Sequence, residues 1–173
     1  MDGPMYFLLA NLSFVDFCLS SVTTPKLITD FLKDNKTISF GGCMSQILFI
    51  HFLAGDEMVL LVTMAYDRCV AICKPLHYSS IMNRQQCILL VLTSWIIGFV
   101  HAASQLAMIL DLPFCGPNII DHFLCDMDSL MALSCAPAPI TEFIFYTQSS
   151  LVLFFTIMYI LRSYTLQIGR AHV

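Results

Sequence analysis

Long apolar stretches separated by short polar connections dominate the pattern of this chain. Four of the stretches are long enough to cross about 30 Å of hydrocarbon, which takes about 20 helical residues. They lie near Pro4–Phe31, Ser39–Cys73, Gln86–Leu110 and Ile140–Tyr164. The pattern therefore predicts an all-α transmembrane protein that contributes four membrane-spanning helices and meets the lipid bilayer along most of its length.

Composition agrees with this pattern. Of the 173 residues, 58% are hydrophobic and 12% are charged, and that charged share is about half of that in an ordinary soluble domain. The net charge is −4 with only 8 Lys and Arg residues, so we expect no nucleic-acid partner. The sequence has no glycine-rich phosphate loop, zinc-protease helix or nucleophile elbow, and we expect no enzyme activity, no metal and no cofactor.

The long connection from about Asp111 to Glu142 sets the expected orientation. It holds five acids, three cysteines and no Lys or Arg, whereas cytosolic loops are rich in Lys and Arg. We therefore place it outside, which puts residues 74–84 in the cytosol and residues 33–36 outside. Only the outer cysteines then meet an oxidising compartment, and sequence alone leaves three ways to pair Cys43, Cys115, Cys125 and Cys135.

The second apolar stretch ends in an adjacent acid and base, Asp67 and Arg68, and Pro75 then stops the helix. Neighbouring residues are about 100° apart around a helix. We expect Arg68 to point into a helix bundle while Asp67 restrains it from the side. Taken alone, such a pair is also compatible with an arginine that snorkels to the membrane surface.

The fifteen residues from Met64 to Tyr78 resemble the signature at the inner end of the third helix of olfactory receptors, a branch of the rhodopsin-like G-protein-coupled receptors. Cys69 departs from it, because the family usually has Tyr there, and Arg162 stands where the family is normally apolar. The resemblance implies that the four stretches are helices two to five of a partial seven-helix receptor bundle. It extends to Pro4–Leu8, Leu12-Ser13 with Asp16, Pro25-Lys26, Trp95, Leu112–Asn118, His122–Asp126 and Ser163-Tyr164.

The resemblance implies a plasma-membrane receptor that binds small volatile odorants between the outer halves of its helices and activates a heterotrimeric G protein. It assigns the ligand to His51, Ala54, Gly55, Met58 and Gln105. It assigns G-protein coupling to Asp67, Arg68, Pro75, Leu76 and Tyr78. The first four ligand residues share one helix face at i, i+3, i+4 and i+7 spacing, for which close helix packing is the alternative.

The resemblance also pairs Cys43 with Cys125 and Cys115 with Cys135. A metal site at His122, Cys125 and Asp126 is the rival hypothesis. The two exclude each other, because a bridged Cys125 has no thiolate to offer a metal ion.

Asp16 and Glu57 lie at similar depths, and we expect them to meet. Two unpaired carboxylates cannot both stay ionised there, so the pair either holds a cation or shares a proton in a hydrogen-bonded structural contact. Asn35 is the acceptor residue of a glycosylation sequon, Asn35-Lys36-Thr37. The sequon lies so close to the membrane that we expect Asn35 to be glycosylated poorly.

The ends of the chain carry further expectations. Residues 168–173 can be back-translated to a run that resembles a sequencing adapter, so we interpret 1–167 as the receptor domain and the rest as a non-native tail, with a short polar tail as the alternative. The resemblance implies that helices one, six and seven are outside the chain, so we expect retention in the endoplasmic reticulum and no signalling.

The rival functions are a non-functional pseudogene or assembly-fragment product, and a transporter or ion-pathway fragment. The lack of an internal repeat disfavours the transporter or ion-pathway fragment.

Overall fold

The computed structural model describes residues 3–32, 39–112, 125, 130 and 139–171. Its elements are α1 (Pro4–Leu32), α2 (Phe40–Cys73), the 3-10 turn η1 (Pro75–His77), α3 (Tyr78–Ile81), α4 (Arg84–Leu110) and α6 (Pro139–Ala171). Within the described residues, four helices are long and apolar enough to cross a membrane. The predicted fold class, four membrane-spanning helices of an all-α protein, is therefore confirmed.

The predicted helix bounds agree with the structure to within two residues, except at the end of the last helix. α6 continues from the predicted end at Tyr164 to Ala171. It therefore includes Gly169, where an added Cβ would meet nothing within 4 Å. Part of the predicted non-native tail is thus helical in the structure, and its origin stays a prediction.

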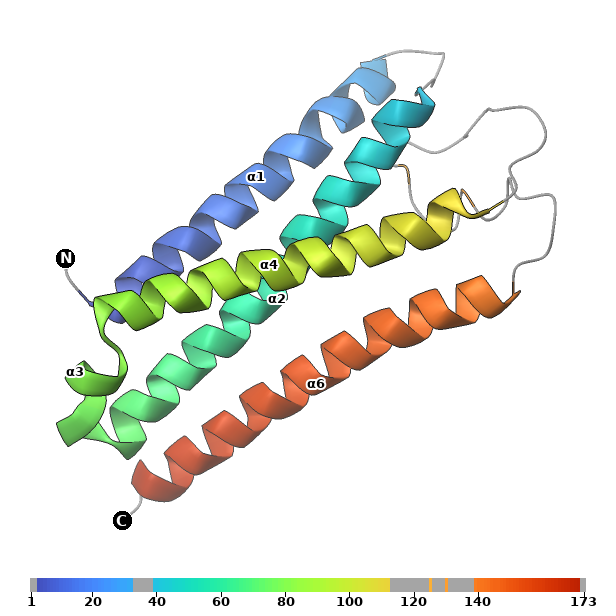
Figure 1. Cartoon of the computed structure of the whole chain (residues 1–173). Coiled ribbons are helices and arrows are strands. Elements are labelled where there is room, and N and C mark those ends of the chain that lie inside the picture. Colours follow the sequence, from blue (N-terminus) through green and yellow to red (C-terminus); the bar gives the residue numbers. More distant parts are fainter. Residues whose placement is uncertain (1–2, 33–38, 113–124, 126–129, 131–138, 172–173) are drawn as a thin grey trace.

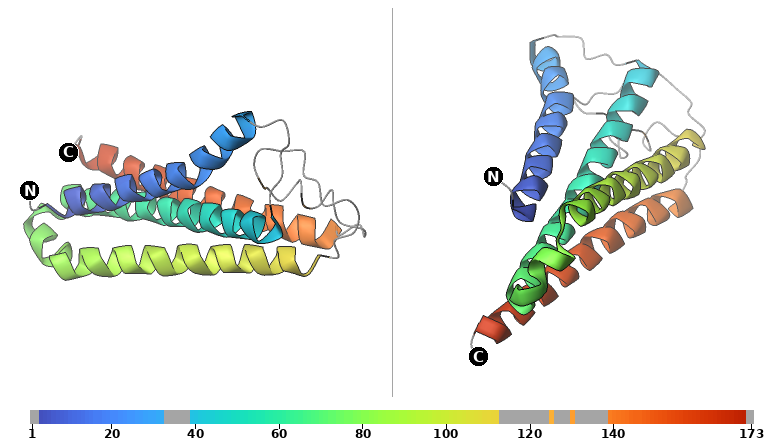
Figure 2. Two further views of the ribbon diagram at one scale, coloured as in Figure 1. Left: turned by 90° about the horizontal axis from the view of Figure 1, so that it is seen from above. Right: turned by 60° about the vertical axis from the view of Figure 1, so that its left-hand side comes forward.

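The helices run alternately up and down, and α2 lies at the centre (Figure 1). It packs against α1, α4 and α6. The start of α1, the short helix α3 and the end of α6 lie at one end of the bundle, which we call the inner end (Figure 1). Cys43 lies at the opposite, outer end. Figure 2 shows that α1 bends in the half that holds Pro25, as expected for a proline inside a helix.

Local chemistry sets the helix ends. The Ser39 hydroxyl accepts a hydrogen bond from the Gly42 amide at 3.2 Å and so caps the start of α2. The Asn83 side chain caps α4 in the same way, accepting from the Gln86 amide at 2.9 Å. α2 ends before Pro75, whose nitrogen has no hydrogen to continue the helical ladder.

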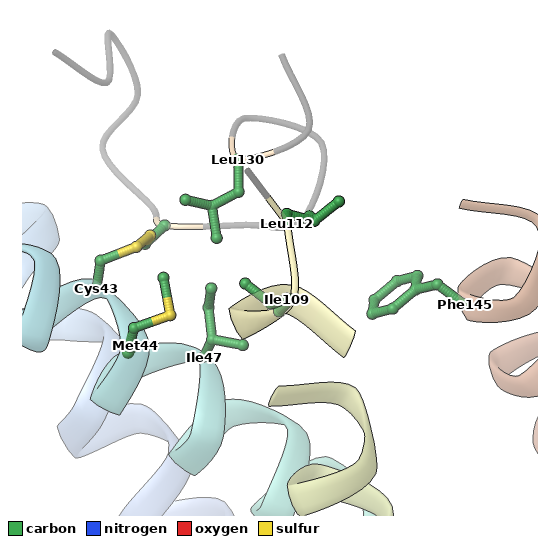
Figure 3. Packing of buried hydrophobic residues seen from close by; sticks show 8 residues of the cluster. Cys43, Met44, Ile47, Ile109, Leu112, Leu130 and Phe145 are labelled. Atoms are coloured by element: carbon green, nitrogen blue, oxygen red, sulfur yellow. A yellow bond between two sulfur atoms is a disulfide. The ribbon is translucent and has the colours of Figure 1, made fainter. Parts of the chain in front are cut away.

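Buried apolar side chains gather at the outer end. This outer cluster includes the disulfide between Cys43 and Cys125, whose Cα atoms are 5.4 Å apart. Figure 3 shows its side chains from α2, α4 and α6 pointing toward one another. Its members are Cys43, Met44, Ile47, Ile109, Leu112, Cys125, Leu130 and Phe145. The cluster and disulfide together fix the outer ends of three helices, while many large apolar residues on the bundle surface remain exposed, as a lipid solvent requires.

Candidate functional site

His51 is the predicted ligand residue that the structure places at a meeting point of three helices. Its half-buried ring lies edge-on to Phe145 of α6, with ring centroids 5.7 Å apart. The ring of His101 on α4 lies on another side, with centroids 6.4 Å apart. His51 therefore faces both α4 and α6 from the central helix.

Gln148 of α6 connects the same place to α4. Its side-chain amide donates a hydrogen bond to the Ser104 hydroxyl at 3.0 Å and lies 3.5 Å from Nδ1 of His101. The Ser104 hydroxyl in turn donates to the carbonyl of His101 at 2.7 Å. Polar side chains in a membrane span are costly and often functional. We call His51, His101, Ser104 and Gln148 the polar cluster.

Gln105 lies next along α4 and is completely buried. Neither the oxygen nor the nitrogen of its carboxamide has a hydrogen-bond partner. An amide buried without partners costs about 1–3 kcal/mol. Gln105 therefore offers a donor and an acceptor that no described protein group satisfies.

Gly55 has a packing role. A Cβ added there would lie 3.3 Å from the Cα of Gly98 on α4, and a Cβ on Gly98 would lie only 2.9 Å from backbone atoms of Asp56 and Phe52. The two glycines thus let α2 and α4 cross at close range. Ala54 and Met58 are half-buried. Gly55 therefore serves close helix packing, the alternative to a ligand-binding hollow on this face of α2. His51, on the same face, contacts Phe145 of α6.

Surface grooves lie elsewhere. One, of about 710 Å³, runs along α6 and is lined by Pro139, Glu142, Phe143, Tyr146, Thr147, Ser150, Leu151 and Phe154. Another, of about 700 Å³, lies at the inner end between α1, α3 and α4 and includes Tyr78 and Arg84 in its lining. Neither groove shares a residue with the polar cluster.

Asp16 of α1 and Glu57 of α2 lie close enough to interact electrostatically. Asp16 is exposed on the described bundle and Glu57 is half-buried. The structure thus brings the two predicted carboxylates near each other, and a bound cation between them stays a prediction.

Asp56 is a buried acid for which the sequence suggested no role. Its side chain is completely buried, and both carboxylate oxygens lack hydrogen-bond partners. Ser94 of α4 lies beside it, but the Ser94 hydroxyl donates to the Val91 carbonyl at 2.8 Å. Asp56 therefore sits in the α2–α4 interface beside the Ser94 side chain, and no group in the described part of the chain meets hydrogen-bond geometry to its carboxylate.

The adjacent acid and base that end the second apolar stretch lie at the inner end of α2. Asp67 is 2% exposed, and its carboxylate accepts a 2.8 Å hydrogen bond from the hydroxyl of Tyr78 on α3. Arg68 is exposed on the described bundle. The expected position of Arg68 inside a complete receptor bundle stays a prediction, because the described part of the chain provides four long helices. The offset between neighbouring helical residues turns Asp67 toward α3 and Arg68 away from it.

Tyr78 titrates outside its ordinary range. Burial, the hydrogen bond to Asp67 and the negative charge of that carboxylate raise the pKa of Tyr78 to about 12. The phenol therefore stays protonated at neutral pH and can donate. The nearby Pro75 and Leu76 are exposed in η1, and Leu76 is 91% exposed, so the predicted coupling residues form a short exposed turn beside the buried Asp67.

Some predicted residues lie outside the described part of the chain. These are Asn35, Cys115, His122, Asp126 and Cys135. Cys125 is described and bridges to Cys43, so it cannot supply the thiolate that the rival metal hypothesis needs. Among the described residues, no group of three or more His, Cys, Asp or Glu is placed to hold a metal ion.

Sequence reasoning missed three residues of the polar cluster. His101, Ser104 and Gln148 each lie within an apolar stretch, and a polar side chain in such a stretch is the signal that could have identified them. Ser104 and Gln148 are 44 residues apart in the chain, so the sequence pattern could not predict their contact. Only the packing of α6 against α2 and α4 brings them together.

Comparison with known proteins places this geometry in a family. A profile described as "Olfactory receptor" matches residues 1–171. Human "Olfactory receptor 4K14" is 55% identical over 164 residues, which is 95% of this chain and 53% of the relative. Human "Olfactory receptor 11H4" is 58% identical over 166 residues, 96% and 51% respectively. Mouse "Olfactory receptor 4M1" is 48% identical over 164 residues, which is 95% of this chain and 52% of the relative. The chain therefore spans about half the length of the curated relatives it matches.

Proposed function

Because the chain belongs to the olfactory receptor family, we propose that it is part of an odorant receptor, a multi-pass protein of the plasma membrane. In its complete form this receptor binds a small volatile molecule at the outer half of the bundle and activates a heterotrimeric G protein at the inner end. The observation that carries the proposal is the polar cluster, where His51, His101 and Gln148 meet from three helices inside the membrane span.

The polar cluster, together with Gln105 next to it along α4, supports ligand binding in its chemistry as well as its place. His51 offers an imidazole edge beside the apolar ring of Phe145, and the Gln105 amide has unused donor and acceptor capacity. A mostly apolar molecule with one polar group can pack on the ring while its polar atom meets an imidazole or amide. Ala54, Gly55 and Met58 then shape the α2 side, and Gly55 does so through the helix crossing.

The inner end supports G-protein coupling through two exposed features, the Arg68 side chain and the turn that contains Pro75 and Leu76. Tyr78 holds the Asp67 carboxylate, which leaves Arg68 exposed for a partner. Pro75 and Leu76 present an exposed apolar turn next to this pair, and an exposed apolar side chain beside charges suits a protein interface. A ligand that changes how α6 packs against α2 would alter the surface around Arg68.

The described helices alone do not complete this function. Large apolar side chains and Asp16 are exposed on the bundle, and a charged group facing hydrocarbon costs several kcal/mol, at least about 2.5 near the bilayer centre. The chain expressed alone is therefore retained in the endoplasmic reticulum and does not signal. A non-functional pseudogene or assembly-fragment product is the second candidate, and it predicts no response even when the other helices are supplied.

A chimeric receptor tests the proposal. The chain is joined to the remaining helices of human olfactory receptor 4K14, its 55%-identical relative, and a panel of odorants is screened by a second-messenger assay with surface display measured in parallel. His51→Ala and Gln148→Ala should change the concentration dependence of the response, and Thr93→Ala, an exposed α4 position, serves as the matched control. A displayed chimera without any response, or with responses that ignore both variants, would refute the proposed site.

A further inference from the structure

Two cysteine thiols lie side by side near the inner end of α2. Cys69 and Cys73 are one helical turn apart, and their sulfur atoms are separated by 3.8 Å. Both side chains are half-buried. Residues four apart on a helix share one face, so both sulfurs are presented in the same direction.

The geometry of the pair suits a bridging atom better than a disulfide. Positions i and i+4 of a helix hold their Cβ atoms about 5–6 Å apart, whereas a disulfide needs about 3.5–4.5 Å. Direct bond formation would distort the last turns of α2. By contrast, two thiolates bound to one tetrahedral zinc ion at about 2.3 Å lie about 3.8 Å from each other. The sulfur atoms of Cys69 and Cys73 are already 3.8 Å apart, so binding one ion between them needs no change in the helix backbone.

The surroundings of the pair favour this chemistry. Cys69 faces α6 closely enough to interact electrostatically with Tyr159, which interacts in the same way with Tyr66. The Cys69 thiol therefore lies on the side of α2 that faces the inner half of α6. The orientation inferred for the chain puts both thiols on the cytosolic side, where thiols stay reduced.

We propose that Cys69 and Cys73 form a two-thiolate site for a thiophilic divalent cation of the zinc type. On binding, two S–H bonds break, two S–metal bonds form, and both protons pass to solvent without any transfer of electrons. The two thiolates neutralise the ion's charge, so the exposed cations of Arg68 and Lys74 do not oppose the bound state. The remaining coordination positions are left to water or a small solvent ligand.

The resemblance to olfactory receptors implies that tyrosine is usual where this chain has Cys69, and a tyrosine would leave Cys73 as a single thiol. The Cys69→Tyr variant therefore removes the site while restoring the usual residue. The proposal is independent of odorant binding and of G-protein activation.

Cadmium titration of the whole chain in detergent micelles tests the proposal, because thiolate-to-cadmium charge transfer gives a direct ultraviolet signal. The protein is kept reduced with a phosphine, and zinc competes for the bound cadmium. We expect one more bound cadmium ion per chain in the unchanged protein than in Cys69→Tyr or Cys73→Ser. Acid should release this ion, because protons compete for the thiolates.

Matched controls keep the result decisive. The double variant Cys18→Ser/Cys87→Ser removes the two other cysteines that the structure describes as reduced, and it should retain the additional ion. Cys69→Ser is the smaller change to use if Cys69→Tyr loses helicity by circular dichroism. Equal cadmium stoichiometry in the unchanged chain and in helical Cys69 and Cys73 variants would overturn the proposal, as would mass-spectrometric recovery of an intrahelical Cys69–Cys73 disulfide under the reducing conditions.

Discussion

The hydroxyl of Tyr78 donates a 2.8 Å hydrogen bond to the carboxylate of Asp67, joining α3 to the inner end of α2. Asp67 is 2% exposed, so this bond is what satisfies a carboxylate that water barely reaches. A buried acceptor left without its donor costs about 1–3 kcal/mol, and more when it is charged. The contact therefore fixes the short α3 helix against α2.

Tyr78→Phe should release that contact. The phenylalanine keeps the ring but removes the donor, so we expect the free energy of unfolding in micelles to fall by about 1–3 kcal/mol. In the chimeric receptor we expect the ligand-independent signal to change. Tyr164→Phe, an exposed tyrosine on α6, is the matched control. Equal stability of the Tyr78 and Tyr164 variants would show that the hydrogen bond contributes nothing.

The pH dependence of this contact has a definite sign. The folded-state pKa of Tyr78 is raised to about 12, above its value of about 10 in an unfolded chain. Its stabilising contribution is therefore complete below pH 10 and is lost as the pH rises toward 12. Tyrosinate absorbance should show one phenol that ionises last and that disappears from the titration in Tyr78→Phe. A complete tyrosine titration near pH 10 would contradict the buried contact.

Gly98→Ala should destabilise the α2–α4 crossing. Its new Cβ would lie 2.9 Å from the Asp56 nitrogen and the Phe52 carbonyl oxygen, and backbone atoms cannot rotate away. We expect a loss of about 1–3 kcal/mol in unfolding free energy, the usual cost of overpacking. Gly41→Ala is the control because nothing lies within 4 Å of its added Cβ. If both variants unfold alike, the helices are further apart than the structure places them.

The apolar pattern was sufficient to predict the helices, because four runs of membrane-spanning length leave few other folds available. It could not predict which side of α2 faces which neighbour. The face containing His51 and Gly55 illustrates this, because small residues suit both a hollow and a close crossing, and only the position of Gly98 decided for Gly55. The burial of Asp67 has the same origin, because its hydrogen-bond partner is Tyr78, eleven residues later in the chain.

Asp56→Asn should leave stability unchanged or raise it. Asp56 is completely buried with both carboxylate oxygens unpartnered, and a carboxylate in that state is destabilising relative to a neutral group of the same shape. Unfolding in micelles at neutral pH measures the effect, with Glu57→Gln as the half-buried control. A loss of more than about 1 kcal/mol in Asp56→Asn would indicate a partner, with the Ser94 hydroxyl as the first to test.

The disulfide between Cys43 and Cys125 should survive purification and stabilise the outer end. It joins residues 82 positions apart, and removing a bridge that closes a long loop typically costs about 2–5 kcal/mol. The Gln46 side chain also accepts a 3.4 Å hydrogen bond from the Cys125 amide, so the connection is held at two neighbouring points. Peptide mapping without reduction should recover Cys43 and Cys125 as one bridged fragment. Quantitative recovery of Cys43 as a free thiol would disprove the pairing.

The chain expressed alone should give no odorant-dependent second-messenger signal. Asp16 is exposed on the described helices within a membrane span, and a charge facing lipid destabilises a membrane bundle, so surface display should be low. Signalling also requires a change at the inner end, where Asp67 accepts a hydrogen bond from Tyr78 of α3 and lies close enough to Cys87 of α4 to interact electrostatically. Supplying the remaining helices from olfactory receptor 4K14 should restore both display and response. A ligand-dependent signal from the chain alone would show that α1, α2, α4 and α6 contain a complete switch, and that the further helices serve another purpose.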